Sequence, residues 1–283
     1  MAAALRGKTV SVSGKTVLPP PARVSQPAYW RNDGCLADQM SAVPAQCAFG
    51  DTKHPTMTVA LVGDSMAGNW WAPLVEIADQ EHWKLVTDLR GNCPLGSAPV
   101  AAPTTTDGAY PECAEWAKTV MHDLVTTIRP QLVIASARQM PVPGYPDSAK
   151  SFTVEGAGEA AYWKQLQAHG MSVIDIAETP NLSALAPSCV EQYGATSSHC
   201  ETPALAALPA GLPSQAAAKL SNVPVVNMND LLCTKGECPS VIGNVLVYLD
   251  NHHLTQQYSD TLARYLKQRL LTTGVVPGHP GQA

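Results

Sequence analysis

The chain has 283 residues, of which 45% are hydrophobic and 14% charged, and its formal net charge is -5. This length and composition suit one large α/β domain with long, rather neutral loops rich in Pro and Ala. The acidic balance, without a clustered basic face, argues against a nucleic-acid partner and against an electrostatic membrane anchor.

The first 29 residues include the Pro-rich stretch LPPPARVSQP at 18–27, which we interpret as a linker or as an arm that packs on the domain. Residues 1–15 lack the apolar core of a signal peptide, and no segment approaches the roughly 18 apolar residues of a membrane helix. We therefore expect that a signal has been removed or that Met1 begins a piece of a longer protein. Residues 273–283 are expected to form a C-terminal tail.

From residue 56 onward, short apolar or β-branched runs alternate with amphipathic segments, which is typical of a parallel sheet with helices on both faces. In chain order, the expected strands are 56–62, 83–89, 131–136, 171–176 and 223–228, followed by a short extended run at 245–250. The expected helices are 71–80, 115–128, 155–170 and 255–271.

Local signals sharpen these helices. The second carries one apolar stripe, made of Trp116, Val120, Leu124 and Ile128. Gly170 is expected to end the third helix, and Thr255 is expected to cap the start of the fourth. The remaining segments 90–113, 137–154 and 177–214 are predicted to be long loops, which in compact domains often carry function.

Eight cysteines fall into four pairs that are close in sequence, each bracketing a loop rich in Gly, Pro or Asp: Cys35 with Cys47, Cys93 with Cys113, Cys189 with Cys200, and Cys233 with Cys238. The sequence has no CxxC motif and no Cys/His spacing typical of a structural metal site, so disulfides are the favoured interpretation. Disulfides indicate an extracytoplasmic, oxidising compartment. The alternative is eight unrelated buried thiols.

The run VALVGDSMAG places Ser65 just after the first of the five strands, where Gly63 allows a tight turn out of the sheet. Near the other end of the chain, YLDNHHLT supplies Asp250 and His253 before the last helix. We predict that Ser65 is a nucleophile, His253 its general base and Asp250 the carboxylate that orients the imidazole.

These assignments have simpler alternatives. Ser65 can be an ordinary serine cap in a strand-to-helix turn, and His253 an exposed loop histidine. The neighbouring His252 is expected to lie behind the site or on the surface. Asp64 is expected to be structural, fixing the turn through backbone hydrogen bonds.

Five segments together resemble the SGNH (GDSL-like) hydrolase superfamily, and within it the extracytoplasmic SGNH domains fused behind acyltransferase-3 membrane domains. The resemblance covers about residues 30–272, and its segments are CLAD at 35–38, CAFGD at 47–51, VGDSMAGNWWAPL at 62–74, RGNCP at 90–94 and LDNHHLT at 249–255. It implies a flavodoxin-like three-layer sandwich, with about five parallel strands between helices, and a catalytic domain over 30–272.

The resemblance also implies an oxyanion hole made from the backbone N–H of Ser65, from Gly91 and from an Asn in a third motif. That third motif is absent, because the chain reads IASARQMPV at 134–142. Losing one oxyanion donor costs roughly 3 kcal/mol unless it is replaced. The candidate replacements are the side chains of Asn92, Ser136 and Arg138.

Two further side chains are candidates for substrate binding. The aromatic rings of Trp70 and Trp71 directly follow the nucleophile segment, and Trp71 is the candidate to contact a sugar ring, whereas helix-to-sheet packing is expected for at least one of them. Arg138 can bind substrate or serve as a structural ion-pair partner.

The leading hypothesis is transfer of an acetyl or other short acyl group through Ser65 to a hydroxyl of an extracytoplasmic glycan or glycolipid. It includes no cofactor and no metal, a monomeric domain, and an upstream membrane acyltransferase domain as partner. A carbohydrate O-acetylesterase would use the same residues with water as acceptor. A glycan-binding module that has lost efficient catalysis is the alternative from another class, and a lipase is less favoured because no apolar lid segment stands out.

Overall fold

The computed structural model describes residues 11–25, 34–102, 108–145, 148–208 and 212–277. Its centre is a seven-stranded sheet in the order β10-β8-β7-β5-β6-β3, with β4 paired to the other part of β6. The strands are β3 (Leu36–Ala37), β4 (Cys47–Gly50), β5 (Met57–Gly63), β6 (Trp83–Arg90), β7 (Leu132–Ser136), β8 (Ser172–Ile176) and β10 (Val225–Val226). All neighbours are parallel except β4, which runs antiparallel to β6.

All five predicted strands are present in this sheet, which confirms the predicted α/β class. The segment 223–228 is shorter than expected, because only Val225 and Val226 pair with β8. Strands β3 and β4 were not predicted, since two to four residues are too few to show a period. The extended run at 245–250 lies outside the main sheet: only β13 (Val245–Leu246) is a strand, and it pairs antiparallel with β12 (Val241–Ile242).

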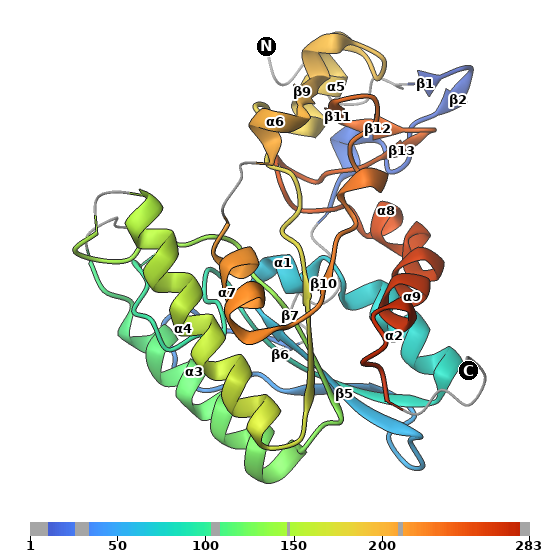
Figure 1. The fold of residues 1–283 in the computed structure, drawn as a ribbon. Coiled ribbons are helices and arrows are strands. Elements are labelled where there is room, and N and C mark those ends of the chain that lie inside the picture. The colour runs from blue at the N-terminus through green and yellow to red at the C-terminus, as the bar shows by residue number, and fades with distance from the viewer. Residues whose placement is uncertain (1–10, 26–33, 103–107, 146–147, 209–211, 278–283) are drawn as a thin grey trace.

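Helices cover both faces of the sheet (Figure 1). Side chains alternate along β5, so that Val59 and Leu61 join one core cluster while Ala60 and Val62 join the other. The first cluster is covered by α2 (Trp71–Glu81), α8 (Gln256–Thr261) and α9 (Ala263–Thr272). The second is covered by α3 (Pro111–Asp123), α4 (Ser148–Ala168) and α7 (Pro213–Ser221).

Several helix boundaries differ from the predictions. Helix α3 begins at Pro111, and a π-helical turn extends it from Leu124 to Ile128. Helix α4 begins inside the segment predicted as the loop 137–154. Its early turns are fixed by buried contacts that no periodicity reveals, because the Ser151 hydroxyl accepts from the N–H of Val142 and Glu155 accepts from the N–H of Met140, both at 2.8 Å.

The last predicted helix is two helices, α8 and α9, with Leu262 between them. The Thr261 hydroxyl bonds back to the carbonyl of Tyr258, which competes with the helical hydrogen bonds at the break. Thr255 is the N-cap of α8, as predicted, since its side chain accepts from the N–H of Tyr258. Gly170 lies two residues past α4 with a φ of +83°.

The predicted loop 177–214 is largely ordered structure. It contains α5 (Ala186–Tyr193), a 3₁₀ turn at Ser198–Cys200, β9 (Glu201–Pro203), α6 (Ala204–Ala207) and the start of α7. Much of it joins a small region that we call the disulfide lobe, made of residues 11–24, 182–207 and 231–247. The lobe also holds β1 (Ser11–Val12), β2 (Lys15–Thr16), β11 (Glu237–Pro239), β12 and β13, and it lies beyond one edge of the sheet layer (Figure 1).

The described part of the N-terminal arm packs on the lobe. The N–H of Leu18 donates to the carbonyl of Asn244, the N–H of Leu246 donates to the carbonyl of Leu18, and Val17 is fully buried in the first core cluster. At the other end, Val275 and Val276 pack against the same cluster. Residues 1–10 and 26–29 of the expected arm, and 278–283 of the expected tail, lie outside the described residues.

The four disulfides join the predicted pairs: Cys35–Cys47, Cys93–Cys113, Cys189–Cys200 and Cys233–Cys238. The last two are in the disulfide lobe. In the described part of the chain, no helix combines the length and the hydrophobicity needed to cross a membrane.

Candidate active site

The carboxyl ends of β5, β6 and β7 meet at one edge of the sheet, and the loops beyond them carry predicted site residues. Gly63, the last residue of β5, is paired with Leu89 of β6 and with the last residue of β7. Ser65, Gly91 and Arg138 each follow these register partners by two residues. The parallel register therefore brings the three positions to the edge where open α/β sheets form their sites.

Gly63 meets a steric requirement at the start of this turn. Its φ is +133°, and a Cβ there would lie 2.0 Å from the carbonyl oxygen of Ser136. Only glycine fits such a close approach of two backbones. The chain can therefore leave β5 abruptly and present Ser65 as the first residue of α1 (Ser65–Gly68).

Asp64 locks two of these loops together. Its Oδ1 accepts a hydrogen bond from the N–H of Met66 at 2.8 Å, and its Oδ2 accepts one from the N–H of Arg138 at 3.0 Å. Burial raises the pKa of Asp64 to about 6, although both backbone hydrogen bonds oppose the rise. The carboxyl thus caps α1 and fixes the loop after β7.

Ser65, His253 and Asp250 form one chain of hydrogen bonds. The Oγ of Ser65 lies 2.7 Å from Nε2 of His253, and Nδ1 of His253 lies 2.6 Å from Oδ2 of Asp250. His253 is only 6% exposed. The structure therefore brings together the three residues that the sequence analysis singled out, in an order that allows the imidazole to take the serine proton.

Asp250 is held in its ionised form. Burial on its own would raise the pKa of this carboxyl, but the hydrogen bond and the charge of His253 outweigh it, and two backbone N–H groups add to the effect. Those N–H groups belong to His252 and His253, and both donate to Oδ1 at 2.8 Å. The net result is a pKa well below the usual range, so the carboxylate can stabilise a positive charge on His253.

A buried amide that the sequence analysis missed fixes the segment carrying the base. The Oδ1 of Asn69 accepts from the N–H of Leu254 at 3.0 Å, and its Nδ2 lies 3.3 Å from Oγ1 of Thr179. The Thr179 hydroxyl in turn donates to the carbonyl of His252 at 2.8 Å. Asn69 lies four residues after Ser65 in a run of small and apolar residues, and a lone amide in such a run is the signal that could have revealed it.

The disulfide lobe holds the same segment from the other side. The N–H of Ala186, at the start of α5, donates to the carbonyl of Asp250 at 2.9 Å, and the N–H of Leu182 donates to the carbonyl of Asn251 at 2.7 Å. The backbone that carries Asp250 and His253 is therefore tied both to α1 and to the lobe.

His252 lies behind the base, and Arg138 bonds to it. Its ring is 4.0 Å from that of His253, centroid to centroid, and its Nε2 lies 2.9 Å from Nη1 of Arg138. Burial lowers the pKa of His252 to about 4, and a positive charge on His253 or Arg138 acts in the same direction, so the ring is neutral near pH 7. Neutral His252 then accepts from Arg138 through Nε2 and donates through Nδ1 to Oδ1 of Asn251, 2.8 Å away.

Arg138 also lies 3.9 Å from Oε1 of Glu178, measured from its Nε. Its side chain is 29% exposed, so it forms structural contacts while part of the side chain stays accessible. Its backbone N–H, by contrast, is already bonded to Asp64.

The other oxyanion candidates lie around the same edge. Gly91 is buried, and a Cβ there would come within 2.6 Å of the side-chain nitrogen of Gln39. Asn92 is half-buried in a left-handed conformation with a φ of +55°. Ser136 is buried, and among the described residues its hydroxyl has no hydrogen-bond partner. None of these contacts distinguishes one replacement donor from another.

The two tryptophans have different surroundings. Trp70 is fully buried in the first core cluster. Trp71 is half-buried against that cluster, and its ring meets Phe49 of β4 edge-on at a centroid distance of 5.4 Å. Packing therefore accounts for Trp70 completely and for one edge of Trp71.

Asp250, His252 and His253 are the three described residues whose ligand atoms lie within 4.8 Å of one another, which is close enough to hold a metal ion. In the geometry seen here, both nitrogens of His253 and of His252 face hydrogen-bond partners. A metal at this position would compete with the contact between His253 and Ser65.

The fold and this site define an α/β protein of the SGNH hydrolase class, with a serine at the carboxyl edge of a parallel sheet. Residues 32–268 match the family described as SGNH domain (fused to AT3 domains), and the chain belongs to that family. Members of this family are hydrolases and acyltransferases, so the chain is placed among enzymes of acyl transfer or ester hydrolysis. No curated protein matches the chain significantly.

The chain is also similar to solved structures, of which the first named here shares its fold. The periplasmic domain of the lipopolysaccharide acetyltransferase of Salmonella ser. Paratyphi A is 17% identical, with a TM-score of 0.61, over 85% of this chain and 92% of that one. A GDSL-like lipase from Bacteroides thetaiotaomicron is 14% identical, with a TM-score of 0.42, over 77% and 89% of the two chains. A protein from Bacteroides fragilis that is described as an acylhydrolase is 12% identical, with a TM-score of 0.42, over 80% of this chain and 91% of that one.

Proposed function

We propose that the protein transfers an acetyl or other short acyl group, through an acyl-Ser65 intermediate, to a hydroxyl of an extracytoplasmic glycan or glycolipid. The observation that carries this proposal is the hydrogen-bonded series from Ser65 through His253 to Asp250. Such a series is what a serine needs to become nucleophilic at neutral pH.

The two half-reactions use the same base. His253 takes the proton of Ser65 as Oγ attacks the acyl carbonyl, and it returns that proton to the leaving group as the acyl–donor bond breaks. It then takes a proton from the acceptor hydroxyl, whose oxygen attacks acyl-Ser65, and gives it back to Oγ as the ester to the serine breaks. The backbone N–H of Ser65 and the Gly91 loop, with Asn92, are the proposed donors to the oxyanion in both steps.

Residues 30–272 are the proposed catalytic domain, and residues 1–29 are the proposed connection to an upstream membrane acyltransferase domain. Three observations support this arrangement: the family's fusion to AT3 domains, the four disulfides, and the periplasmic acetyltransferase domain of similar fold. The domain would work as a monomer in the periplasm, cell envelope or cell surface, without a metal or other cofactor.

An O-acetylesterase is the second candidate function, since water can replace the acceptor hydroxyl on the same intermediate. Incubation with p-nitrophenyl acetate, with and without glycan acceptors, separates the two. Acylated glycan, found by mass spectrometry, supports transfer. Turnover that releases only acetate, at a rate the glycans do not change, supports the esterase.

Ser65→Ala tests the enzymatic proposal as a whole. Wild-type protein should form a covalent adduct with a fluorophosphonate probe, and the variant should not. Acylation of surface glycans in cells that carry only Ser65→Ala should fall to the level of a deletion strain. Unchanged glycan acylation in those cells would instead indicate a glycan-binding module that does not catalyse the transfer.

A further inference from the structure

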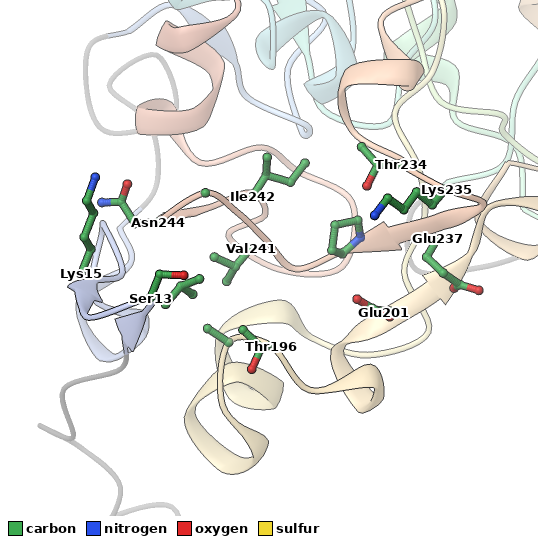
Figure 2. A pocket seen from close by; sticks show the side chains of 14 residues that line it. Ser13, Lys15, Thr196, Glu201, Thr234, Lys235, Glu237, Val241, Ile242 and Asn244 are labelled. Carbon is green, nitrogen blue, oxygen red and sulfur yellow. The ribbon is translucent and has the colours of Figure 1, made fainter.

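A cavity in the disulfide lobe has a volume of about 720 Å³ (Figure 2). It is open to solvent on one side. Five stretches of chain line it: the β1–β2 hairpin, the loop after α5, the start of β9, β11 with its preceding turn, and the β12–β13 hairpin. This volume is in the range of sites that bind small molecules.

The walls of this cavity are braced against one another. Cys189–Cys200 and Cys233–Cys238 each close one of the wall segments. The backbone and the hydroxyl of Ser240 both donate to the carbonyl of Cys200, at 2.9 and 2.8 Å, and link β12 to the region of β9. The contacts between Leu18 and the β12–β13 hairpin fix the third wall. The cavity is therefore built into the lobe.

The lining mixes polar groups with small apolar surfaces. Ser13, Lys15, Thr196, Glu201, Thr234, Lys235, Glu237 and Asn244 supply the polar groups, while Val12, Pro239, Val241 and Ile242 supply the apolar ones. Figure 2 shows Lys15 and Lys235 at opposite ends, with Thr196 and Val241 between them. None of the two lysines and two glutamates forms an ion pair with another described residue.

These features restrict the class of ligand. Two ammonium groups and two carboxylates cancel in net charge, which disfavours a polyanion such as a nucleic acid. An apolar ligand is also disfavoured, because it would cover four charged groups without offering them a hydrogen-bond partner. A ligand rich in hydroxyls, which can both donate and accept hydrogen bonds while resting its C–H faces on the apolar patches, satisfies both parts of the lining.

The cavity is coupled to the candidate active site through the backbone. Its β12–β13 hairpin ends at Leu246, four residues before Asp250. Its second wall continues from α5, whose first N–H bonds to the carbonyl of Asp250. A ligand held here would lie on the same lobe that supports the general base.

We propose that the cavity of the disulfide lobe binds a neutral oligosaccharide segment of the acceptor glycan at a distance from the hydroxyl that is acylated. This inference rests on the proposed function for its physiological role, but the binding itself does not require Ser65. Holding one part of a polymeric acceptor in the lobe raises the effective concentration of its hydroxyls at Ser65.

The Cδ1 methyl group of Ile242 is a direct reporter of this cavity. Protein labelled with ¹³C at isoleucine methyls is titrated with neutral tetrasaccharides of glucose, mannose, galactose, arabinose and N-acetylglucosamine. The expected result is a saturable shift of the Ile242 signal with at least one of them, while the buried Ile77 of α2 stays unshifted. Absence of an Ile242 shift with every sugar would overturn the proposal.

Thr196→Trp provides the blocking variant, because Thr196 is exposed at the cavity wall and has room for a larger ring. Binding should weaken about tenfold or more, as expected when a bulky group fills a weak site. Thr119→Trp, at an exposed position of α3, is the matched control and should bind like the wild type. Equal binding by both variants would contradict the assigned location.

Activity separates this proposal from the previous one. Thr119→Trp should match the wild type in hydrolysing p-nitrophenyl acetate and in acylating the polymeric glycan. Thr196→Trp should acylate the polymeric glycan more slowly relative to its own hydrolysis of p-nitrophenyl acetate. Ser65→Ala should still show the Ile242 shift. An Ile242 shift together with wild-type glycan acylation by Ser65→Ala would refute the enzymatic proposal and leave the binding site standing.

Discussion

The candidate site joins two regions that are stabilised in different ways. The sheet edge presents Ser65 from a long strand that is buried at every position except Thr58 and whose register with β6 and β7 extends up to Gly63. The disulfide lobe supports the segment of Asp250 and His253 with strands of two or three residues, two disulfides and a few backbone hydrogen bonds.

This difference indicates which half of the site is easier to disturb. Sheet residues are fixed by many apolar contacts that fail only when the whole core unfolds. The lobe has only strands of two or three residues and contains two disulfides, so it relies more on covalent links. The position of the base relative to the nucleophile should therefore depend on the lobe, while the position of the nucleophile should not.

The most severe test removes the base and leaves both regions intact. His253→Ala should lower kcat for p-nitrophenyl acetate by roughly 10⁴-fold or more, because Ser65 then has no group to accept its proton. His122→Ala, at an exposed position of α3, is the control and should be fully active. A His253→Ala enzyme within tenfold of wild type would rule out the assigned base.

The second test loosens the lobe without touching the site. Replacing Cys189 and Cys200 by Ser should lower the free energy of unfolding by roughly 2 to 3 kcal/mol in the chain-entropy model. Activity should fall by about tenfold even where the protein stays folded, since α5 no longer fixes the carbonyl of Asp250 as firmly.

The Cys35–Cys47 disulfide is a matched control for that experiment, because its sequence separation is 12 against 11 for Cys189–Cys200. Its removal should cost similar stability, as followed by urea unfolding, but should change the activity of the folded protein less. Equal activity losses would show that the sheet edge and the lobe contribute alike to the site.

The sequence predicts the sheet edge well for a physical reason. Runs such as that of β5 are buried on both faces, so their apolar character survives in the sequence alone, and a glycine followed by Asp64 and Ser65 indicates where the turn must come. The four disulfide pairs are also readable, because each closes a short loop.

The lobe and the supports of the base are harder to predict from the sequence. The strands of the lobe are too short to show a period. Helix α7, of which only the first two residues fall in the predicted loop 177–214, was not predicted, because its packing against α4 fixes it more than its own pattern does. Asn69 and Thr179 matter through partners far away in the sequence, more than 70 residues in each case. No local pattern encodes such contacts.

Asn69→Ala tests the link between the two regions with a smaller expected effect. The N–H of Leu254 would lose its buried acceptor, which should lower the free energy of unfolding by about 1 to 3 kcal/mol. The activity of the folded protein should fall severalfold, because the segment of His253 is less well placed. Asn69→Asp keeps an acceptor oxygen for Leu254 and should retain more of the activity, and thermal unfolding with steady-state kinetics measures both.

Several buried carboxyl groups near the candidate site should make the stability of the protein depend mildly on pH. Burial is the main cause that raises the pKa of Asp175 and of Glu178 to about 7, and that of Asp64 to about 6. Glu155 and Glu159 on α4 are shifted in the same direction for the same reason. These groups bind protons more tightly in the folded protein than in the unfolded chain, where the usual values are near 4.

Their contribution to stability is complete below about pH 4 and is lost as the pH rises through 6 and 7. His252 opposes this trend, because its lowered pKa makes protonation between pH 6.5 and 4 unfavourable in the folded state, but it is one group against several. The melting temperature should therefore be a few degrees higher at pH 5 than at pH 7.5.

Asp175→Asn should reduce this difference, since the buried amide does not ionise, whereas Asp79→Asn at an exposed position of α2 should leave it unchanged. A melting temperature that rises from pH 5 to pH 7.5 would contradict this prediction. It would show that the cost of protonating His252 in the folded protein outweighs the stability gained by protonating the buried carboxyls.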